Sequence, residues 1–405
     1  MEKVLTARIG KKDSRSIDTY LADGGYAGAK RVLTSGMTPE QVIEEVKKAN
    51  VRGRGGAGFS AGVKWGFLPK DTRGKPIYLL CNADESEPGT FKDRLLMEND
   101  PHQLIEGMIL ASYAIKCRNA YIYIRGEFYD GARILEKAIE EAYAKGYLGE
   151  KILGSGFSLD ITVHRGAGAY ICGEESAMIE SIEGKRGMPR LRPPYVAQVG
   201  LFGRPTLEHN METLYWVRDI LERGAAWFAD QGRRGRKGLR SFSVSGRVAK
   251  PGVHLAPAGI SVRELIDEYC GGMLPGHELY AYLPGGASGG ILPASLADVP
   301  LDFDTLQPHG CFIGSAAIIV LSRHDRARDA ALNLMRFFAD ESCGQCTPCR
   351  VGTEKAVRIL EQPRWDVPLL EELSQAMADA SICGLGQAAP NPVACVIKYF
   401  PQELE

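Results

Sequence analysis

The chain has 405 residues, with 49 basic and 50 acidic side chains and a formal net charge of -1. This length is typical of about three domains, and the near-neutral charge gives no support for a nucleic-acid partner. The sequence holds no run of about 18 apolar residues and lacks the apolar core of a signal peptide, so we expect a cytoplasmic protein with no segment inserted in a membrane. Its ten cysteines therefore indicate metal, cluster or redox sites rather than disulfides.

The first predicted element is a helix in the segment TPEQVIEEVKKAN. Thr38 is a good N-cap, Pro39 suits the first helical position, and Gln41 completes a capping box. The helix leads directly into a glycine-rich loop, RGRGGAGF.

Strand-like and helix-like segments alternate from this loop to about residue 223. Three apolar runs, at 77–81, 120–124 and 159–163, predict buried strands. The segments after the second and third runs predict helices. This alternation predicts an α/β fold, with helices on the faces of a parallel sheet.

A basic segment, GRRGRKGLR at 232–240, marks the predicted boundary of the next unit. It lacks interleaved aromatic residues, which favours a solvated linker over a nucleic-acid patch. Beyond it the sequence predicts a hairpin, a helix with a Ser261–Glu264 capping box, and two further strands. We therefore predict a small α+β module at 240–325 and, from three amphipathic segments that follow, a helical bundle.

The glycine-rich loop matches the dinucleotide-binding pattern G-x-G-x-x-G at Gly53, Gly55 and Gly58. A helix rather than a strand precedes it, so an ordinary Rossmann phosphate turn is not expected. Glycines still let backbone N–H groups approach a phosphate or a flat ring closely, and a flexible turn is the alternative. Arg54 and Lys64 add positive charge suited to a phosphate, although lone cations are usually solvated.

Polar side chains follow the first predicted strand directly. Asn82, Asp84, Glu85 and Glu87 would lie at its carboxyl end, where parallel α/β sheets bind ligands. Asn82 can both donate to and accept from the edge of a heterocycle, and a carboxylate suits the hydroxyls of a ribose. A polar loop facing solvent is the alternative, but four such residues at a strand end favour a site.

A second acidic segment follows the third predicted strand. Glu174 and Glu175 begin its helix, where carboxylates also gain from the helix dipole. Cys172 has no histidine or basic partner close in sequence, so it is predicted to be a buried apolar side chain rather than a nucleophile. The same interpretation applies to four other cysteines: Cys81, Cys117, Cys270 and Cys311.

Three cysteines, Cys343, Cys346 and Cys349, lie in one loop between the first two helices of the predicted bundle. A [4Fe–4S] cluster needs four thiolates, and we expect the fourth to be Cys383, in a loop with glycine and proline, rather than Cys395 in an apolar segment. Zinc is the main alternative, but its ligands usually come two by two from two loops. A catalytic CxxC fits less well, because two overlapping pairs would be redundant.

Five motifs stand in order along the chain: RGRGGAGF, CNADESEPGTFKDR, YICGEESAMIESIEGKRG, LFGRPTLEHNMETL and SCGQCTPCRVGT. Together they closely resemble the NADH-binding flavoprotein subunit of respiratory complex I, a module that also occurs in NAD-reducing hydrogenases and NAD-dependent formate dehydrogenases. The resemblance implies a Rossmann-like FMN and NADH domain with an N-terminal helical segment (1–235), a ubiquitin-like, SLBB-like β-grasp module (240–325) and a helical bundle that carries a [4Fe–4S] cluster (326–405).

The resemblance also implies the residues of each site. Those expected to contact FMN are Gly53, Arg54, Gly55, Gly56, Lys64, Asn82, Asp84, Glu85, Gly173, Glu174, His209, Asn210 and Thr213. Those expected to bind NAD(H) are Phe59, Phe67 and Tyr195 around the adenine, Glu87 at the ribose, Glu175 at the nicotinamide carboxamide, and Arg192. The expected cluster ligands are Cys343, Cys346, Cys349 and Cys383. No side chain is expected to act as a general acid or base, because the flavin supplies the chemistry.

Three positions depart from the common complex I pattern. Arg192 stands in place of lysine and Tyr195 in place of phenylalanine, which keeps the charge and the ring. His209 stands in place of the first of two asparagines, which puts one contact of the flavin loop in question. The segments LEHNMETLYWVRDILE and GRRGRKGLRSFSVSGRV look more like the corresponding subunit of soluble NAD-dependent formate dehydrogenases.

The resemblance therefore implies a diaphorase subunit that transfers electrons between NAD(H) and an iron–sulfur chain through FMN and a [4Fe–4S] cluster. The expected partners are a thioredoxin-like [2Fe–2S] subunit and a catalytic subunit of the iron–sulfur/molybdenum or complex I type, in the cytoplasm or at the cytoplasmic face of a membrane. The alternatives are the NADH-oxidising subunit of complex I or of an NAD-reducing hydrogenase, and a zinc-stapled, non-catalytic nucleotide-binding subunit.

Overall fold

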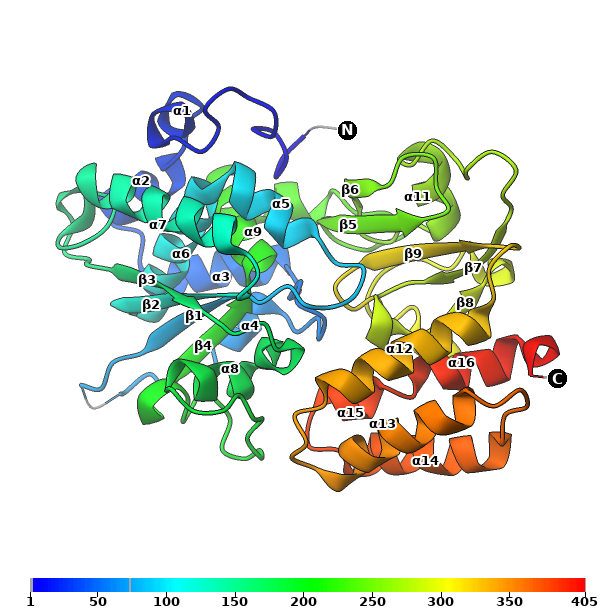
Figure 1. Cartoon of the computed structure of the whole chain (residues 1–405). Coiled ribbons are helices and arrows are strands. Elements are labelled where there is room, and N and C mark those ends of the chain that lie inside the picture. Colours follow the sequence, from blue (N-terminus) through cyan, green and yellow to red (C-terminus); the bar gives the residue numbers. More distant parts are fainter. Residues whose placement is uncertain (1–2, 73, 405) are drawn as a thin grey trace.

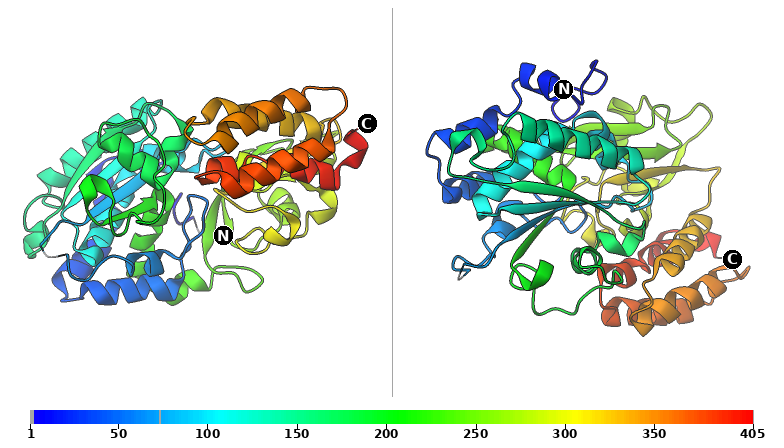
Figure 2. Two further views of the ribbon diagram at one scale, coloured as in Figure 1. Left: turned by 90° about the horizontal axis from the view of Figure 1, so that it is seen from below. Right: turned by 60° about the vertical axis from the view of Figure 1, so that its left-hand side comes forward.

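The computed structural model describes residues 3–72 and 74–404, which form an α/β unit, a smaller unit around a second sheet, and a helical unit at the C-terminal end (Figure 1). The helical unit packs beside the second sheet in every view (Figure 2). Within the described residues, no helix is long and apolar enough to cross a membrane.

The first sheet has four parallel strands in the order β3-β2-β1-β4. β1 (Tyr78–Ala83), β2 (Asn119–Ile124) and β3 (Asp160–Arg165) confirm the three predicted strands, with ends shifted by one or two residues. β4 (Thr206–Asn210) is not predicted from the sequence, because its segment TLEHN is short and mostly polar. The extra strand places β1 between β2 and β4, in the middle of the sheet.

Helices cover both faces of this sheet. Leu79 and Cys81 of β1 pack into one hydrophobic core, whereas Leu80 between them packs into the other core with α8 (Glu175–Ile182). This alternation is expected of a strand buried on both faces. The other helices of the unit are α1 (Ile17–Ala22), α2 (Ala27–Thr34), α3 (Pro39–Ala49), α4 (Ala61–Trp65), α5 (Lys92–Asn99), α6 (Pro101–Ile115), α7 (Tyr129–Ala144), α9 (Met211–Arg223) and α10 (Ala225–Ala229).

The second sheet has five strands in the order β6-β5-β9-β7-β8 and shares a core with α11 (Val262–Glu268). The β5–β9 pair is parallel and the other pairs are antiparallel. A mixed sheet with one helix against it is the predicted β-grasp arrangement, and the Ser261–Glu264 capping box is present. The strands are β5 (Leu239–Gly246), β6 (Gly252–Pro257), β7 (Leu279–Leu283), β8 (Leu292–Pro293) and β9 (Ala317–Ser322).

The basic segment 232–240 is not the solvated linker that its composition predicts. Arg240 is only 1% exposed, and its guanidinium lies 4.3 Å from the ring centre of Phe303. Arg234 donates from both terminal nitrogens to the carboxylate of Glu264 on α11. Because these partners lie thirty to sixty residues further along the chain, the local composition gives no indication of them.

The C-terminal unit contains the three predicted helices, α12 (Ala327–Glu341), α13 (Thr347–Leu360) and α14 (Val367–Ala380). Two short helices, α15 (Gly384–Ala388) and α16 (Asn391–Tyr399), complete it. α13 starts earlier than its apolar pattern predicts, because Pro348 suits the first helical turn. Cys349 therefore lies on a helix rather than in the predicted loop, while Cys343 and Cys346 precede that helix.

Candidate functional site

The carboxyl ends of β1 and β4 meet where the strand order of the first sheet reverses, and Asn82 pairs with Asn210 in register. In open α/β sheets, ligands bind at such a switch point. The segment after β3 reaches the same place, because Asn82 Nδ2 donates to Gly173 O at 2.9 Å. Three of the motifs singled out in the sequence are therefore brought together at this edge.

The glycine-rich loop joins this edge from α3, whose predicted capping box is present. As expected, a helix rather than a strand precedes the loop. A Cβ added to Gly55 would lie 3.0 Å from Cβ of Asn210, and one added to Gly58 would lie 2.1 Å from the ring of Phe303. Gly58 also has a φ of +66°, which favours glycine. The loop therefore needs glycine at both positions to lie close to β4 and to the second sheet unit.

Arg54 and Thr213 connect the loop to other elements. Arg54 N donates to Thr213 Oγ1 at 2.9 Å, and the buried guanidinium of Arg54 donates to Leu239 O at 2.7 Å and lies 4.0 Å from Glu212. The Arg54 side chain is thus engaged with α9 and β5. The positive charge next to the ends of β1 and β4 comes from Lys64 instead.

Lys64 and Arg192 form a connected network with three carboxylates. Lys64 Nζ lies 3.2 Å from both Glu175 Oε2 and Glu208 Oε2. Arg192 pairs with Glu174, and with Glu175 at 3.1 Å. Burial alone would lower the pKa of Lys64, but Glu208 and Glu175 outweigh it and raise that pKa, so the lysine stays charged. Two cations thus face three carboxylates.

Glu208 is the member of this network that was not among the predicted site residues, although it lies within the motif LFGRPTLEHNMETL. Its Oε1 accepts a hydrogen bond from Asn82 Nδ2 at 2.9 Å. It lies two residues before Asn210 and therefore on the same face of β4. Had β4 been recognised as a strand, that spacing could have indicated Glu208.

His209 lies on the opposite face of β4. Its Nε2 accepts a hydrogen bond from Trp65 Nε1 at 2.7 Å, and the ring is buried. Burial, together with the charge of Lys64, lowers the pKa of His209 well below its usual range, so the ring is neutral. This unusual residue therefore packs beneath the sheet, whereas its neighbour Asn210 caps α9 and donates to Asp93 Oδ2 at 2.7 Å.

The two acidic residues that follow β1 differ in their surroundings. Asp84 Oδ1 accepts from Ser86 Oγ, while its buried Oδ2 has no partner among the described residues, and burial raises the pKa of Asp84 to about 7. Glu85 accepts from the backbone N–H groups of Asp93 and Arg94 at the start of α5. Burial and the Asp93 charge raise the pKa of Glu85 to about 8. Asp84 therefore has an acceptor to spare for a ligand, and Glu85 acts as a helix cap.

Glu87 joins the α/β unit to the second sheet unit. Its Oε1 accepts from both N and Oγ of Ser288, at 2.8 and 2.7 Å, and its Oε2 accepts from Tyr170 Oη at 2.5 Å. Both carboxylate oxygens of Glu87, which is predicted to bind the ribose, thus have protein partners. A ribose would have to share or replace these hydrogen bonds.

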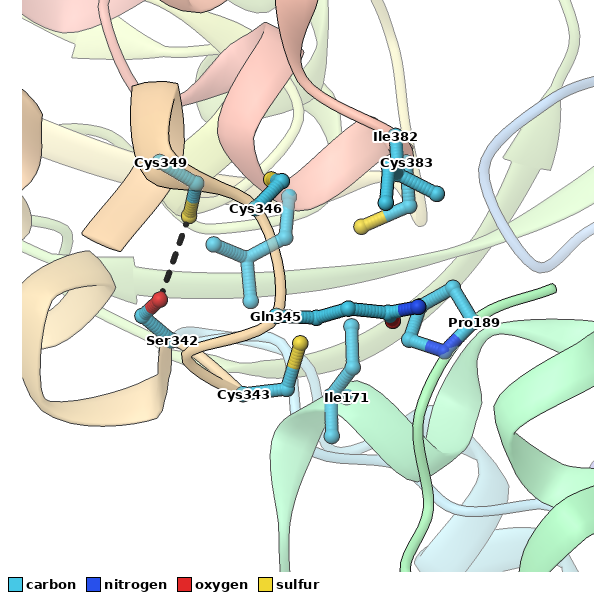
Figure 3. Close-up of a pocket in the computed structure, with 10 residues that line it drawn as sticks. Ile171, Pro189, Ser342, Cys343, Gln345, Cys346, Cys349, Ile382 and Cys383 are labelled. Carbon is cyan, nitrogen blue, oxygen red and sulfur yellow. Dashed lines mark hydrogen bonds between the residues drawn. The ribbon is translucent and has the colours of Figure 1, made fainter. Parts of the chain in front are cut away.

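The four predicted cluster ligands line one cavity (Figure 3). Cys343 and Cys346 come from the loop after α12, Cys349 from the first turn of α13, and Cys383 from the residue before α15. Ser342, Gln345, Ile382 and Leu385 line the same cavity, and Ile171 and Pro189 close it from the α/β unit.

The cysteines surround this cavity without converging on one point. Within residues 3–72 and 74–404, no three His, Cys, Asp or Glu side chains are placed to hold a single metal ion. The four thiols around one cavity match the number of ligands that a [4Fe–4S] cluster needs. Cys395 lies outside the cavity in α16, buried 3.4 Å from Sγ of Cys311. The structure thus groups Cys383, and not Cys395, with the other three.

Family models match most of the chain. The Nuo51 FMN-binding domain matches residues 46–219, the SLBB domain 241–292, and the NADH-ubiquinone oxidoreductase-F iron-sulfur binding region 329–405. An NADH-quinone oxidoreductase subunit of Rhizobium meliloti (strain 1021) is 47% identical over 408 residues, which cover 99% of this chain and 96% of that protein. The chain belongs to the complex I 51 kDa family.

Other members of this family are similarly close. The corresponding NADH-quinone oxidoreductase subunit of Rickettsia felis (strain ATCC VR-1525 / URRWXCal2) is 45% identical over 411 residues, which cover 100% of this chain and 96% of that protein. Among solved structures, an NAD+-reducing [NiFe]-hydrogenase in the H2-reduced state superposes with a TM-score of 0.84 and 38% identity. The chain is 96% covered in that superposition but spans only 66% of the hydrogenase chain.

As a member of the complex I 51 kDa family, the chain is an NADH-oxidising subunit whose cofactors are FMN and a [4Fe–4S] cluster. The residues present fit both groups. The close approach of Gly55 to β4 and the unpartnered Oδ2 of Asp84 suit a flat ring with polar edges. The four thiols around one cavity suit the cluster.

The three aromatic side chains predicted to surround the adenine are exposed in this family member. The side chains of Phe59, Phe67 and Tyr195 are 48%, 57% and 56% exposed, although large apolar side chains are usually buried. The ring centres of Phe59 and Phe67 are 5.5 Å apart and tilted. The two phenylalanines thus present a neighbouring pair of faces rather than an open slot. Such faces suit stacking of a heterocycle, as predicted for adenine.

Proposed function

We propose that this chain is the diaphorase subunit of an NAD-dependent formate dehydrogenase, transferring electrons between NAD(H) and an iron–sulfur chain. One segment, residues 170–175, carries the argument for the transfer route. Ile171 lines the cysteine cavity, while Gly173 accepts a hydrogen bond from Asn82 at the switch point of the sheet. The proposed FMN site and the cluster cavity are thus two residues apart along the chain.

The protein's own part in this function is to bind and orient. FMN, when bound by this chain, would supply the chemistry that links two-electron hydride transfer with NAD(H) to one-electron transfer with the cluster. Asn82, Asp84 and Lys64 would hold the flavin, and Glu175 would hold the nicotinamide carboxamide. The Phe59–Phe67 surface would hold the adenine. The transfer requires no side chain that acts as a general acid or base.

The parent complex is the part of the proposal that rests on sequence resemblance alone. The segments LEHNMETLYWVRDILE and GRRGRKGLRSFSVSGRV favour formate dehydrogenase. In that complex the flow would run from a molybdenum or tungsten subunit, through a thioredoxin-like [2Fe–2S] subunit and this chain, to NAD⁺. The second candidate is an NADH-oxidising subunit of complex I or of a hydrogenase, which is supported by the Rhizobium relative and the hydrogenase structure.

Purification of the intact assembly from its native source, followed by metal analysis, tests the parent complex. Molybdenum or tungsten with formate-dependent reduction of NAD⁺ would support formate dehydrogenase. Nickel with H₂-dependent reduction, or a quinone-reducing membrane assembly, would overturn that assignment in favour of the second candidate.

The cofactor assignment is tested on the chain itself. Anaerobically purified protein is expected to contain iron and sulfide, to show flavin absorbance, and to oxidise NADH with ferricyanide as acceptor. Zinc without flavin absorbance would instead support the nucleotide-binding scaffold.

A further inference from the structure

Glu208 is held in the middle of the proposed flavin site by the sheet itself. The register of β4 places it opposite Leu80 of β1, on the same face as Asn82 one step further along. Its side chain is 12% exposed, so its conformation is fixed by surrounding atoms.

Among the residues that the structure describes, every polar contact of the Glu208 side chain is with a residue predicted to bind FMN. Oε1 accepts from Asn82 Nδ2 at 2.9 Å, and Oε2 accepts from Lys64 Nζ at 3.2 Å. Lys64 Nζ also donates to the backbone oxygen of Glu208 at 2.8 Å. Glu208 therefore orients the Asn82 amide together with Gly173 O and Asp84 N. Among the described residues it also supplies two of the three acceptors around the Lys64 ammonium, the third being Glu175.

Glu208 also changes the balance between cationic and anionic side chains at this site. Without Glu208, the cations Lys64 and Arg192 would be matched by the two carboxylates Glu174 and Glu175. Burial raises the pKa of Glu208, but the adjacent Lys64 ammonium favours its carboxylate, so Glu208 adds a third carboxylate to two cations. Nearby charge is one of the means by which a protein tunes the electronics of a bound flavin.

We propose that Glu208 is a positioning residue that orients Asn82 and Lys64 and makes the bound FMN harder to reduce. The proposal rests on the proposed function, since it requires FMN at the switch point. Hydride transfer moves two electrons and one proton from NADH to FMN, which adds one negative charge to the site. A fixed carboxylate beside Lys64 opposes that added charge and so favours the return of electrons to NAD⁺.

The test compares the flavin midpoint potential of the full-length protein, loaded with FMN, in the wild type, Glu208→Gln, Glu208→Asp and a control. Glu208→Gln keeps an acceptor for Asn82 but removes the charge. Glu183→Gln is the control, because Glu183 is 10% exposed and ion-paired with Arg190 and Lys185 but contacts neither Asn82 nor Lys64. Potentials are measured by spectroelectrochemical titration, with FMN content and thermal unfolding determined in parallel.

We expect Glu208→Gln to favour the reduced flavin by about tenfold, a shift of about 30 mV to more positive potential for a two-electron couple. Glu208→Asp and Glu183→Gln are expected to stay near the wild-type value. If Glu208→Gln loses FMN during purification, its dissociation constants for reduced and oxidised FMN are measured instead. The ratio of these two constants, compared with the wild-type ratio, gives the same tenfold change in preference for the reduced flavin.

An unchanged potential, or an unchanged ratio, in Glu208→Gln would overturn the proposal. So would an equal shift in Glu183→Gln. A wild-type protein that binds no FMN would instead overturn the cofactor assignment, and this outcome is distinguished by the flavin absorbance before any variant is compared.

Discussion

The proposed flavin site is built from segments far apart in the chain, whereas three of the four cavity cysteines lie within seven consecutive residues. Asn82 and Glu208 meet because β1 and β4 are neighbours in the sheet, and α4 brings Lys64 to Glu208. At the cavity, the turn before α13 already brings Cys343, Cys346 and Cys349 together. The first site therefore depends on the fold of the α/β unit, and the second depends mostly on local geometry.

The two sites also differ in the polarity of the side chains that surround them. The flavin site holds several partly or fully buried ionisable groups that are stabilised by one another, such as Lys64 with Glu175 and Glu208. The cavity is lined by thiols together with Ile171, Pro189, Ile382 and Leu385, and among the described residues its other polar side chains are those of Ser342 and Gln345. A carboxylate removed from the first site leaves Lys64 or Arg192 with one ion-pair partner instead of two, while a ligand removed from the second leaves a cluster short of one thiolate.

The largest expected effect is the loss of the cluster in Cys383→Ser. Because this residue supplies the remote ligand, we expect iron and sulfide content to fall to a small fraction of the wild-type value while FMN content is kept. Reduction of ferricyanide by NADH is expected to persist, because the flavin can be oxidised directly.

The matched control is Cys395→Ser, which changes a buried cysteine of the same unit that does not line the cavity. It is expected to keep its iron. Iron loss in this control with retention in Cys383→Ser would reverse the ligand assignment, and loss of FMN in Cys383→Ser would show that the two sites are not independent.

A smaller effect is expected from Gly58→Ala, which tests how strictly the flavin site depends on the fold. The new Cβ would overlap the Phe303 ring at a positive φ. We expect the free energy of unfolding to fall by about 2 to 5 kcal/mol, from backbone strain and overpacking together. Urea denaturation of the wild type and of Gly58→Ala measures this difference in the free energy of unfolding.

Gly156→Ala provides the control for that measurement, because no atom lies within 4 Å of its added Cβ and its φ is not positive. The iron content of Gly58→Ala should fall less than its FMN content. Equal stability of the two variants would contradict the proposed close contact between the loop and the second sheet unit.

The smallest expected effect concerns Asp84 and the pH. The folded-state pKa of Asp84, about 7, lies above the unfolded-state value of about 3.9. The native protein therefore binds more protons than the unfolded chain between these values, and its free energy of unfolding falls as the pH rises from about 4 to 7. The full shift corresponds to about 4 kcal/mol. In the apoprotein, Asp84→Asn is expected to raise the free energy of unfolding by part of this amount at pH 8 and by little at pH 4.

Thermal unfolding of the FMN-free protein across this pH range measures the difference between Asp84→Asn and the wild type. A gain that is the same at pH 4 and pH 8 would mean that the charge of Asp84 is not its cause. The same variant is expected to bind FMN more weakly than the wild type, because it replaces a carboxylate whose Oδ2 is free to accept.

The sequence predicts features whose causes are local. The capping boxes at Thr38 and Ser261 are confirmed, because each depends on a few neighbouring residues. The three clustered cysteines line one cavity for the same reason. The helical start of α13 is the exception, since an apolar pattern says little about a first turn that contains Thr347 and Pro348.

Features that depend on distant partners are not visible in the sequence. β4 is too short and polar to be predicted, so Glu208 is missed and the position of His209 beneath the sheet cannot be known. The buried setting of Arg240 depends on Phe303, which is some sixty residues away. The resemblance supplied the expected flavin residues, but only the register of β1 and β4 shows which polar atoms face one another.

The walls of the cysteine cavity have a consequence for the cluster's lifetime. Ile171 and Pro189 belong to the α/β unit, and Arg186 of that unit donates to the backbone oxygen of Cys343 at 3.3 Å. A fragment with only the C-terminal helices would keep every ligand yet leave one side of the cluster open to water and oxygen. The first unit thus acts as a cover, and an excised bundle should lose its iron in air faster than the whole chain.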